Sequence, residues 1–403
     1  MVPSPAAGGP DPGDTPNDAH HRRSPPHAAR AHVTAQDMGG AAVAFVLALA
    51  GLWLVGAVLL SALRTVVVPR GERPVLTGLV FLTLRRALDL PLRHASAERR
   101  ERILGRYAPA ALVLLAGTWA VLVIIGFTPV HWALGDLSWM EALQVSGSSL
   151  TTLGFVSASP APSRLVEILE ALLGLGLVGL LISFLPAIYG AYSQRELLVA
   201  QLTTRAGEPP AAATFVIRHH RIGGLDQLDD TWAEWEDWFS QVEETHSSYP
   251  SLVYFRSGPN RNWITSAGAI LDSAAIMLSA VDVPWRPGAA LTLRAGFLCL
   301  REVADQFLLP YDADPQPDGR VSVTRDEFDR SWDELAAAGV PLKADRDQAW
   351  TDFRGWRVNY DEPLLGLCAL VEPPPAPWSS DRVAPVPRRV LATVWRLRRA
   401  SRT

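Results

Sequence analysis

The sequence has very little cysteine and none of the common short catalytic motifs. Its two cysteines, Cys299 and Cys368, lie far apart and each sits inside an apolar run. This excludes a disulfide framework and a cysteine-rich metal site, and it predicts two buried, inert thiols. No Gly-x-Ser-x-Gly turn, phosphate-binding loop or His-Glu-x-x-His helix occurs. We therefore expect no enzyme, no cofactor and no metal site.

Charge is missing from three long stretches of the chain. Residues 40–63 carry no charged side chain, and residues 107–130 and 165–190 are almost purely apolar. An α-helix rises about 1.5 Å per residue, so about 20 residues cross the hydrocarbon core of a bilayer, which is about 30 Å thick. The sequence therefore predicts three transmembrane helices and an all-α membrane protein with the lipid bilayer as a partner.

The stretch between the first two predicted spans is basic. Residues 64–106 hold ten arginines and four acids, and the apolar run 75–92 is interrupted by Arg85, Arg86 and Asp89. Charges in the middle of a helix are costly in lipid, so residues 75–92 are interpreted as an amphipathic helix on the cytoplasmic surface, with a short fourth span as the alternative. Positive residues favour the cytoplasmic side. We therefore expect a multi-pass protein of the cell membrane, with its N-terminus outside and its C-terminal domain in the cytoplasm.

The second half of the chain has the pattern of a helix-rich soluble domain. Trp232, Trp235 and Trp238 are spaced like one face of a helix, and Thr324 with Glu327 has the spacing of a capping box. Helical patterns cover 228–246, 263–281, 289–309, 326–338 and 345–360. The complete predicted division is a disordered tail (1–38), an anchor helix (39–64), a basic cytoplasmic segment (65–106), a span–loop–span module (107–192), a helical cytoplasmic domain (193–372), and a proline-rich linker with a basic tail (373–403).

The connection between the second and third spans carries the most informative motif. Residues 139–150 are compatible with a short helix, and they are followed by Thr-Thr-Leu-Gly-Phe-Val-Ser at 151–157 and by Pro160. This layout resembles the pore module of the two-transmembrane potassium channel family, over about residues 107–192. The resemblance implies a closed homotetramer, because one copy supplies only a quarter of a filter, and it implies conduction of potassium or other monovalent cations.

The resemblance also assigns roles to the residues of this loop. The implied selectivity filter, whose backbone carbonyls replace the water around an ion, consists of Thr151, Thr152, Leu153, Gly154, Phe155 and Val156. Thr152 would add a ring of hydroxyl groups, and Gly154 would permit a left-handed backbone turn. Leu153 and Phe155 would pack against the preceding helix.

The sequence departs from the family pattern at two filter positions. Val156 stands in place of the second filter glycine, and Ser157 in place of an acid that often braces the filter. Positive φ is unfavourable for a β-branched residue, so the outermost carbonyl ring is not expected in its usual geometry. A potassium-selective pore and a pore for monovalent cations in general both stay open.

The third span contains further candidates. Gly174 and Gly176 lie where inner helices of the family carry a gating hinge, although glycines also let helices pack closely in lipid. Pro186 would add a kink near the inner mouth. Glu167 and Glu170 would attract cations or link this span to the pore helix.

A second function class fits the same sequence. The rival to a channel is a channel-derived, non-conducting membrane protein that acts as a sensor or an interaction partner. Nothing in the sequence indicates binding to nucleic acid, and the charge run of α-helical pattern around residues 234–244 is typical of a solvated face. The sequence does not identify a ligand of the cytoplasmic domain.

Overall fold

The computed structural model describes residues 35–67, 75–157, 161–258, 260–285 and 287–382. The chain divides into two units, residues 1–43 and 44–403, and the contacts discussed below lie within the second. The predicted disordered tail, apart from residues 35–38 in the first helix, and the predicted basic C-terminal tail lie outside the described residues.

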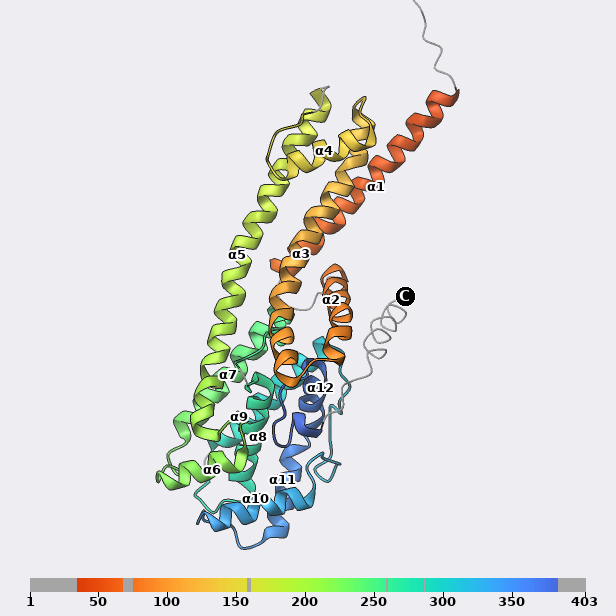
Figure 1. Cartoon of the computed structure of the whole chain (residues 1–403). Coiled ribbons are helices and arrows are strands. Elements are labelled where there is room, and N and C mark those ends of the chain that lie inside the picture. The colour runs from red at the N-terminus through yellow and green to blue at the C-terminus, as the bar shows by residue number, and fades with distance from the viewer. Residues whose placement is uncertain (1–34, 68–74, 158–160, 259, 286, 383–403) are drawn as a thin grey trace, which may run out of the picture. The chain divides into compact units, whose positions relative to one another are not determined.

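Every regular element in the described part of the chain is a helix (Figure 1). The elements are α1 (Ala35–Val66), α2 (Val75–Arg93), α3 (Ala97–Leu134), α4 (Trp139–Leu150), α5 (Ala161–Ala206), α6 (Ala212–Arg221), α7 (Asp229–Ser248), η1 (Pro250–Tyr254), α8 (Trp263–Ser279), α9 (Pro287–Gln306), α10 (Arg325–Ala337), α11 (Arg346–Arg357), α12 (Asp361–Val371) and η2 (Ser380–Arg382). The sheet-type pairing within these ranges is one isolated bridge between Val281 and Leu342. The prediction of an all-α chain is confirmed.

Among the described residues, three helices are long and apolar enough to cross a membrane. They cover Gly39–Val66, Ala97–Leu134 and Ala161–Ala206, which confirms the three predicted stretches. Helix α2 is not among them, because Arg85, Arg86 and Asp89 interrupt its apolar sequence. The composition of the helices therefore gives no support to the alternative of a fourth span.

Helix α5 continues far beyond the predicted end of the pore module. Its 46 residues correspond to about 69 Å, roughly twice the thickness of the hydrocarbon core. The predicted boundary between residues 192 and 193 therefore falls inside one uninterrupted helix. Val199, Leu202 and Ala206 near its C-terminal end are buried in the core of the C-terminal domain. The domain and the third span thus share one helix.

Helices α1 and α3 approach each other closely at two glycines. A Cβ atom on Gly51 would overlap the carbonyl oxygen of Gly126, and one on Gly126 would lie 2.7 Å from Cγ2 of Val55. Trp119 and Val123 of α3 are buried in the same cluster. Small residues at such a crossing let helix backbones pack closely in lipid. The extra N-terminal span is therefore packed directly against the first span of the predicted pore module.

The C-terminal domain is built around α8. All 17 residues of α8 are buried, and the helix contacts α5, α6, α9, α11 and α12. On α7, Trp232, Trp235 and Trp238 are buried, as their spacing predicts. Cys299 and Cys368 are free and buried, also as predicted. A helix that is buried on every side has to be apolar all round, and this explains why α8 lacks the one-sided pattern of its neighbours.

A buried ionic network joins three elements of this domain. The guanidinium of Arg357 donates to Asp272 of α8 at 2.6 Å and to Asp361 of α12 at 2.7 Å, and the hydroxyl of Tyr360 donates to Asp272 at 2.7 Å. Burial lowers the pKa of Arg357, but the two carboxylates outweigh it and raise that pKa above its usual value. Arg357 therefore stays charged, and its remaining nitrogen donates to the carbonyl of Trp378 at 2.7 Å.

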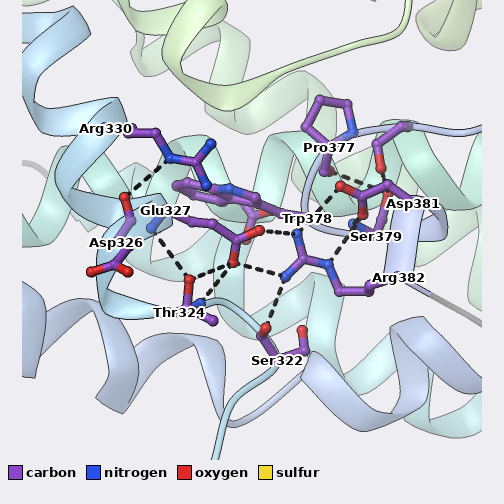
Figure 2. A network of polar contacts seen from close by, with 12 residues as sticks. Ser322, Thr324, Asp326, Glu327, Arg330, Pro377, Trp378, Ser379, Asp381 and Arg382 are labelled. Atoms are coloured by element: carbon purple, nitrogen blue, oxygen red, sulfur yellow. Dashed lines mark hydrogen bonds and ion pairs between the residues drawn. The ribbon is translucent and has the colours of Figure 1, made fainter.

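The segment after α12 is packed against the domain as far as residue 382, although the sequence suggests a linker from residue 373. The ring of Trp378 packs edge-on against Phe353, with ring centroids 5.5 Å apart. Arg382 donates to Glu327 at 3.1 Å and to the carbonyl of Ser322 at 2.8 Å (Figure 2). Glu327 also completes the predicted capping box with Thr324 at the start of α10. One carboxylate therefore holds both a helix terminus and the C-terminal segment.

The basic stretch 64–106, which includes the start of α3, contacts the C-terminal end of α12. Arg85 of α2 and Arg100 of α3 both form ion pairs with Glu372, and Arg256 pairs with Glu101 of α3 at 2.6 Å. The guanidinium of Arg256 also donates to the carbonyl of Glu372. These contacts attach the segment that precedes the second span to the C-terminal domain.

Arg195 fixes the C-terminal half of α5 to the same domain. This fully buried guanidinium donates to the carbonyls of Leu252 at 2.9 Å and Phe255 at 2.7 Å, and to Nε2 of His246 at 3.1 Å. The Nδ1–H of His246 donates to the carbonyl of Val242 at 2.9 Å, so the ring is in one neutral tautomer. Burial and the neighbouring Arg195 charge lower the pKa of His246 well below its usual value.

This lowered pKa predicts a loss of stability in acid. In the unfolded chain His246 titrates near its ordinary pKa of about 6.5, so below that pH the unfolded state binds a proton that the folded state does not. The apparent stability should fall as the pH decreases from 7.5 to 5, by up to about 1.4 kcal/mol per pH unit for one proton. Thermal unfolding followed by tryptophan fluorescence should show a shallower pH dependence for His246→Gln, with the two proteins compared at pH 8 as the reference. If the stability of His246→Gln fell with decreasing pH as steeply as that of the wild type, His246 would not be the group that causes the acid sensitivity.

Candidate pore loop

The element that defines the candidate site is α4, the short helix between the second and third spans. Ser138 caps its N-terminus: the hydroxyl of Ser138 accepts from the backbone N–H of Glu141, and the carboxylate of Glu141 accepts from the backbone N–H of Ser138 at 2.8 Å. This is a complete capping box, which satisfies two otherwise unpaired backbone donors. The 12 residues of α4 contact both α3 and α5 (Figure 1). The predicted helix at 139–150 is confirmed.

A buried polar network holds α4 between its two neighbours. Glu170 of α5 accepts from the hydroxyl of Ser146 on α4 at 2.5 Å and from Nε2 of His131 on α3 at 2.9 Å. Nδ1 of His131 lies 3.3 Å from the hydroxyl of Ser163 on α5. All four side chains are buried. Hydrogen bonds to a charged acceptor are short and strong, and removing one member leaves the others unpaired in a low-dielectric interior.

The chain after α4 folds back over the last turn of that helix. The backbone N–H of Leu153 donates to the carbonyl of Ser148 at 3.0 Å, and that of Thr152 donates to the carbonyl of Ser149 at 2.9 Å. These two bonds form a Schellman motif at the C-terminus of α4. In this motif the residue after the C-cap has a left-handed backbone conformation. Thr152 takes that conformation with φ of 56°. Further along, the backbone N–H of Val156 donates to the hydroxyl of Ser148 at 3.3 Å.

The structure shows the backbone conformation and the exposure of the predicted filter residues. Gly154 has φ of 67°, so the left-handed turn predicted there is present. Leu153 and Phe155 were expected to pack against α4, but their side chains are 68% and 66% exposed. That expectation is wrong for a single chain, in which most of both side chains is exposed. Thr151 lies at the end of α4, where its hydroxyl donates to the carbonyl of Gly147 at 2.6 Å.

The two acids of the third span have separate roles. Glu170 is fully buried and accepts from Ser146 and His131, so it links α5 to α4 and α3 within this chain. Glu167 accepts from the hydroxyl of Ser157 at 2.9 Å. Helix α5 thus brings a carboxylate to the serine that follows residues 151–156.

The two glycines of the predicted hinge differ in their surroundings. A Cβ atom on Gly174 would overlap the carbonyl oxygen of Leu150, the last residue of α4, whereas the space around Gly176 is open to 4 Å. Gly174 therefore permits a close approach between α5 and the end of α4, which is the alternative to a hinge. Helix α5 continues through Pro186 without ending.

Sequence reasoning missed the residues that build the buried network. Ser146, Ser163 and His131 all lie in apolar helices, where a lone serine or histidine carries little information. The signal that could have found them is the density of serine in α4, because a polar side chain in an apolar helix needs a partner. Their partners come from three different helices, so their identity depends on the fold.

Comparison with known proteins adds no relative. No protein-family model, no curated protein and no solved structure matches the chain significantly. Within the described ranges, no group of three histidine, cysteine, aspartate or glutamate side chains is arranged to hold a metal ion. The functional argument therefore depends on the geometry of α3, α4 and α5.

The buried network predicts a large difference between the two acids of α5. Glu170→Ala leaves Nε2 of His131 without its acceptor, whereas Ser146 keeps the carbonyl of Ile124 at 3.1 Å, and the change should lower the stability of the purified protein by about 3–5 kcal/mol. Glu167→Ala, one turn earlier, removes a hydrogen bond at a half-buried position and should cost at most about 1 kcal/mol. Thermal unfolding in detergent compares the two. Equal effects would show that the network does not hold α4.

A second pair of variants separates close packing from a hinge. Gly174→Ala forces a methyl group against the carbonyl of Leu150 and should destabilise the protein by about 1–3 kcal/mol, the usual cost of overpacking. Gly176→Ala has free space and a better helix former, and it should be neutral or slightly stabilising. Thermal unfolding of both variants checks this. If Gly176→Ala were the more damaging change, the hinge interpretation would be restored.

Proposed function

We propose that this protein is a subunit of a homotetrameric cation channel in the cell membrane. Four copies would bring residues 151–156 around a common axis, and their backbone carbonyls would coordinate potassium or other monovalent cations. The observation that carries the proposal is the anchoring of α4 between two membrane-length helices by Glu170. A short helix fixed in this way positions the loop that follows it, and that loop contains the left-handed Gly154.

Unpartnered apolar surface next to the loop supports an assembly. Leu153 and Phe155 of the loop are exposed. Helix α5 also exposes a row of large apolar side chains with helical spacing. The row consists of Leu165, Ile168, Leu169, Leu172, Leu175, Val178 and Ile182. Lipid or a neighbouring copy of the chain would cover such a surface, because exposed apolar patches of this extent mark membrane or protein contacts. In a fourfold ring, neighbouring copies would cover one part of this surface and lipid would cover the rest.

The ion pairs of Glu372 support the topology that belongs to this proposal. Arg85 and Arg100 lie in the basic segment before the second span, and Glu372 ends α12. Charged side chains that contact each other have to be on the same side of a membrane. The basic segment and the C-terminal domain would thus both be cytoplasmic, with α4 and the loop on the outer side and the N-terminus outside.

The geometry of Thr152 favours a second candidate function, a non-conducting membrane sensor or interaction protein. In a filter, this threonine would contribute a hydroxyl to the ion path. Here it is the left-handed cap residue of α4, and Ser148 holds the loop at Leu153 and Val156. An extended filter would have to break these hydrogen bonds, although it would release the about 1–2 kcal/mol that the left-handed conformation of Thr152 costs.

The deciding experiment is ion flux into proteoliposomes that contain the purified full-length protein. Potassium and sodium gradients are compared in parallel. Gly154→Ala places a Cβ atom on a left-handed residue in each of four copies, so flux should fall by more than roughly tenfold. The control is Gly117→Ala on α3, where the added methyl group meets nothing within 4 Å.

Each outcome has one meaning. Flux that is lost in Gly154→Ala and kept in Gly117→Ala supports the channel, and the ratio of potassium to sodium flux gives its selectivity despite Val156. No flux from a verified tetramer would overturn the channel in favour of the sensor. Equal loss in both variants would show that Gly154 has no special role.

A further inference from the structure

A cavity of about 180 Å³ lies in the C-terminal domain, where the end of α8 meets the start of α7 and the start of α9. Its lining is mostly apolar, and four of the lining side chains are at most 4% exposed: Leu228, Trp232, Val281 and Ala289. A cavity of about 150 Å³ is large enough to hold a benzene molecule. The cavity therefore has room for a small organic ligand, and an apolar hollow with a few polar groups is the usual form of such a site.

The walls of this cavity are fixed by contacts between the helices, and its mouth is open to solvent. The carbonyl of Trp232 on α7 accepts from the hydroxyl of Thr292 on α9 at 2.8 Å. A Cβ atom on Gly288 would lie 3.2 Å from Cβ of Trp232, so the two helices are in close contact there. Asp226 and Trp285 also line the cavity, and both are exposed. A ligand can therefore enter a site whose shape is already formed.

The polar group that distinguishes the cavity is the side chain of Lys343. Of the 37 lysines and arginines in the chain, it is the only lysine. Its backbone N–H donates to the carbonyl of Ala280 at 2.9 Å, and its Nζ donates to the carbonyl of Leu278 at 2.7 Å. These two bonds hold Lys343 against the end of α8, where it lines the cavity.

The ammonium of Lys343 pairs with no carboxylate among the described residues. Asp226, the acid that lines the cavity, is exposed to solvent and forms no ion pair with it. An ammonium has three N–H donors, of which the carbonyl of Leu278 takes one. A half-buried cation beside an apolar cavity attracts a counter-ion more strongly than one in water does, because the local dielectric constant is lower. The cavity therefore favours a ligand with an anionic end.

We propose that this cavity binds a small carboxylic acid with an apolar ring or chain. The carboxylate would accept charge-assisted hydrogen bonds from Lys343, and the apolar body would be buried against Trp232, Val281 and Ala289. A single cation and an otherwise apolar lining suit one negative charge better than a phosphate, which carries more charge and more acceptors. The proposal does not rest on ion conduction, because it requires only the folded C-terminal domain within the full chain.

The test measures the binding of benzoate to the purified full-length protein in nanodiscs of phosphatidylcholine. Equilibrium dialysis with radiolabelled benzoate should give a dissociation constant of about 1 mM or below. Benzyl alcohol has the ring without the charge, and acetate has the charge without the ring. Each should bind at least roughly tenfold more weakly than benzoate, since each lacks one of the two interactions.

The single lysine gives a second readout that locates the ligand. An amine-selective acylating reagent modifies Lys343 and the α-amino group of the chain, and mass spectrometry separates the two products. Bound benzoate should slow the acylation of Lys343 and leave that of the α-amino group unchanged. Equal rates of Lys343 acylation with and without saturating benzoate would contradict contact between the two.

Two variants and a matched control make the test specific. Lys343→Met removes the charge and keeps an unbranched side chain, and it should weaken benzoate binding at least roughly tenfold. Ala289→Leu fills the cavity while Lys343 stays in place, so it should abolish binding, and it serves as the second variant if Lys343→Met does not fold. Ala233→Leu makes the same change at an exposed position of α7 and should bind like wild type.

The results discriminate between a carboxylate site and an unused cavity. Benzoate binding that is lost in Lys343→Met and Ala289→Leu, and kept in Ala233→Leu, supports the site. Benzyl alcohol binding as tightly as benzoate would show that Lys343 does not recognise the ligand, and it would overturn the proposal. The absence of binding at millimolar benzoate, or equal binding in all the variants, would overturn it as well.

Discussion

The arrangement of the membrane part depends on one buried carboxylate. Glu170 lies inside the packing of α3, α4 and α5, and it accepts from one side chain on each of the two neighbouring helices. An isolated charge in such surroundings would be very costly, so the helices have to bring His131 and Ser146 to it. This requirement fixes how α4 sits, because a 12-residue helix alone has too few contacts to define its own position. The loop with Gly154 begins where this helix ends.

Helix α5 makes the membrane part and the C-terminal domain mechanically continuous. Gly174 lies against the end of α4, and Arg195, less than six turns further along, donates to Leu252 and Phe255 in the domain. A second connection runs through Glu372, which binds arginines of α2 and α3. A change in the domain would therefore reach the second span and the third span by separate routes. Arg195 and Glu372, at the centres of these two connections, are 2% and 12% exposed, and buried charged groups hold their geometry better than surface pairs do.

The loop at 151–156 is where local chemistry and the channel hypothesis conflict. Thr152 closes a helix cap that normally uses glycine, and Ser148 binds the loop twice. These local bonds give an isolated chain a stable alternative to an extended filter. In an assembly of four copies, the exposed Leu153 and Phe155 would gain apolar neighbours, and burying each would contribute about 1.5–3 kcal/mol. The balance between the local hydrogen bonds of the loop and the burial of Leu153 and Phe155 between copies decides whether the proposed pore forms.

The sequence by itself determined the helical class, the three membrane-length helices, the short helix at 139–150 and most helices of the C-terminal domain. These features depend on local patterns: apolar length, the spacing of Trp232, Trp235 and Trp238, and the capping box at Thr324. It also located the left-handed Gly154, because glycine is the residue that adopts this conformation without strain. Selectivity was left open, since a single chain carries only part of a filter.

Only the tertiary structure decided which partner each polar side chain has. Nothing local in the sequence pairs His131 with Glu170, joins Arg357 to Asp272, or places the carbonyl of Leu150 against Gly174, because these contacts connect residues that are 24 to 85 positions apart. The same holds for the residues after 372, where the prolines suggest a linker. In the structure Trp378 packs against Phe353 of α11, and Arg382 donates to Glu327 of α10. Local propensity selects the helices; the cost of leaving a buried charge or carbonyl unpaired selects how they fit together.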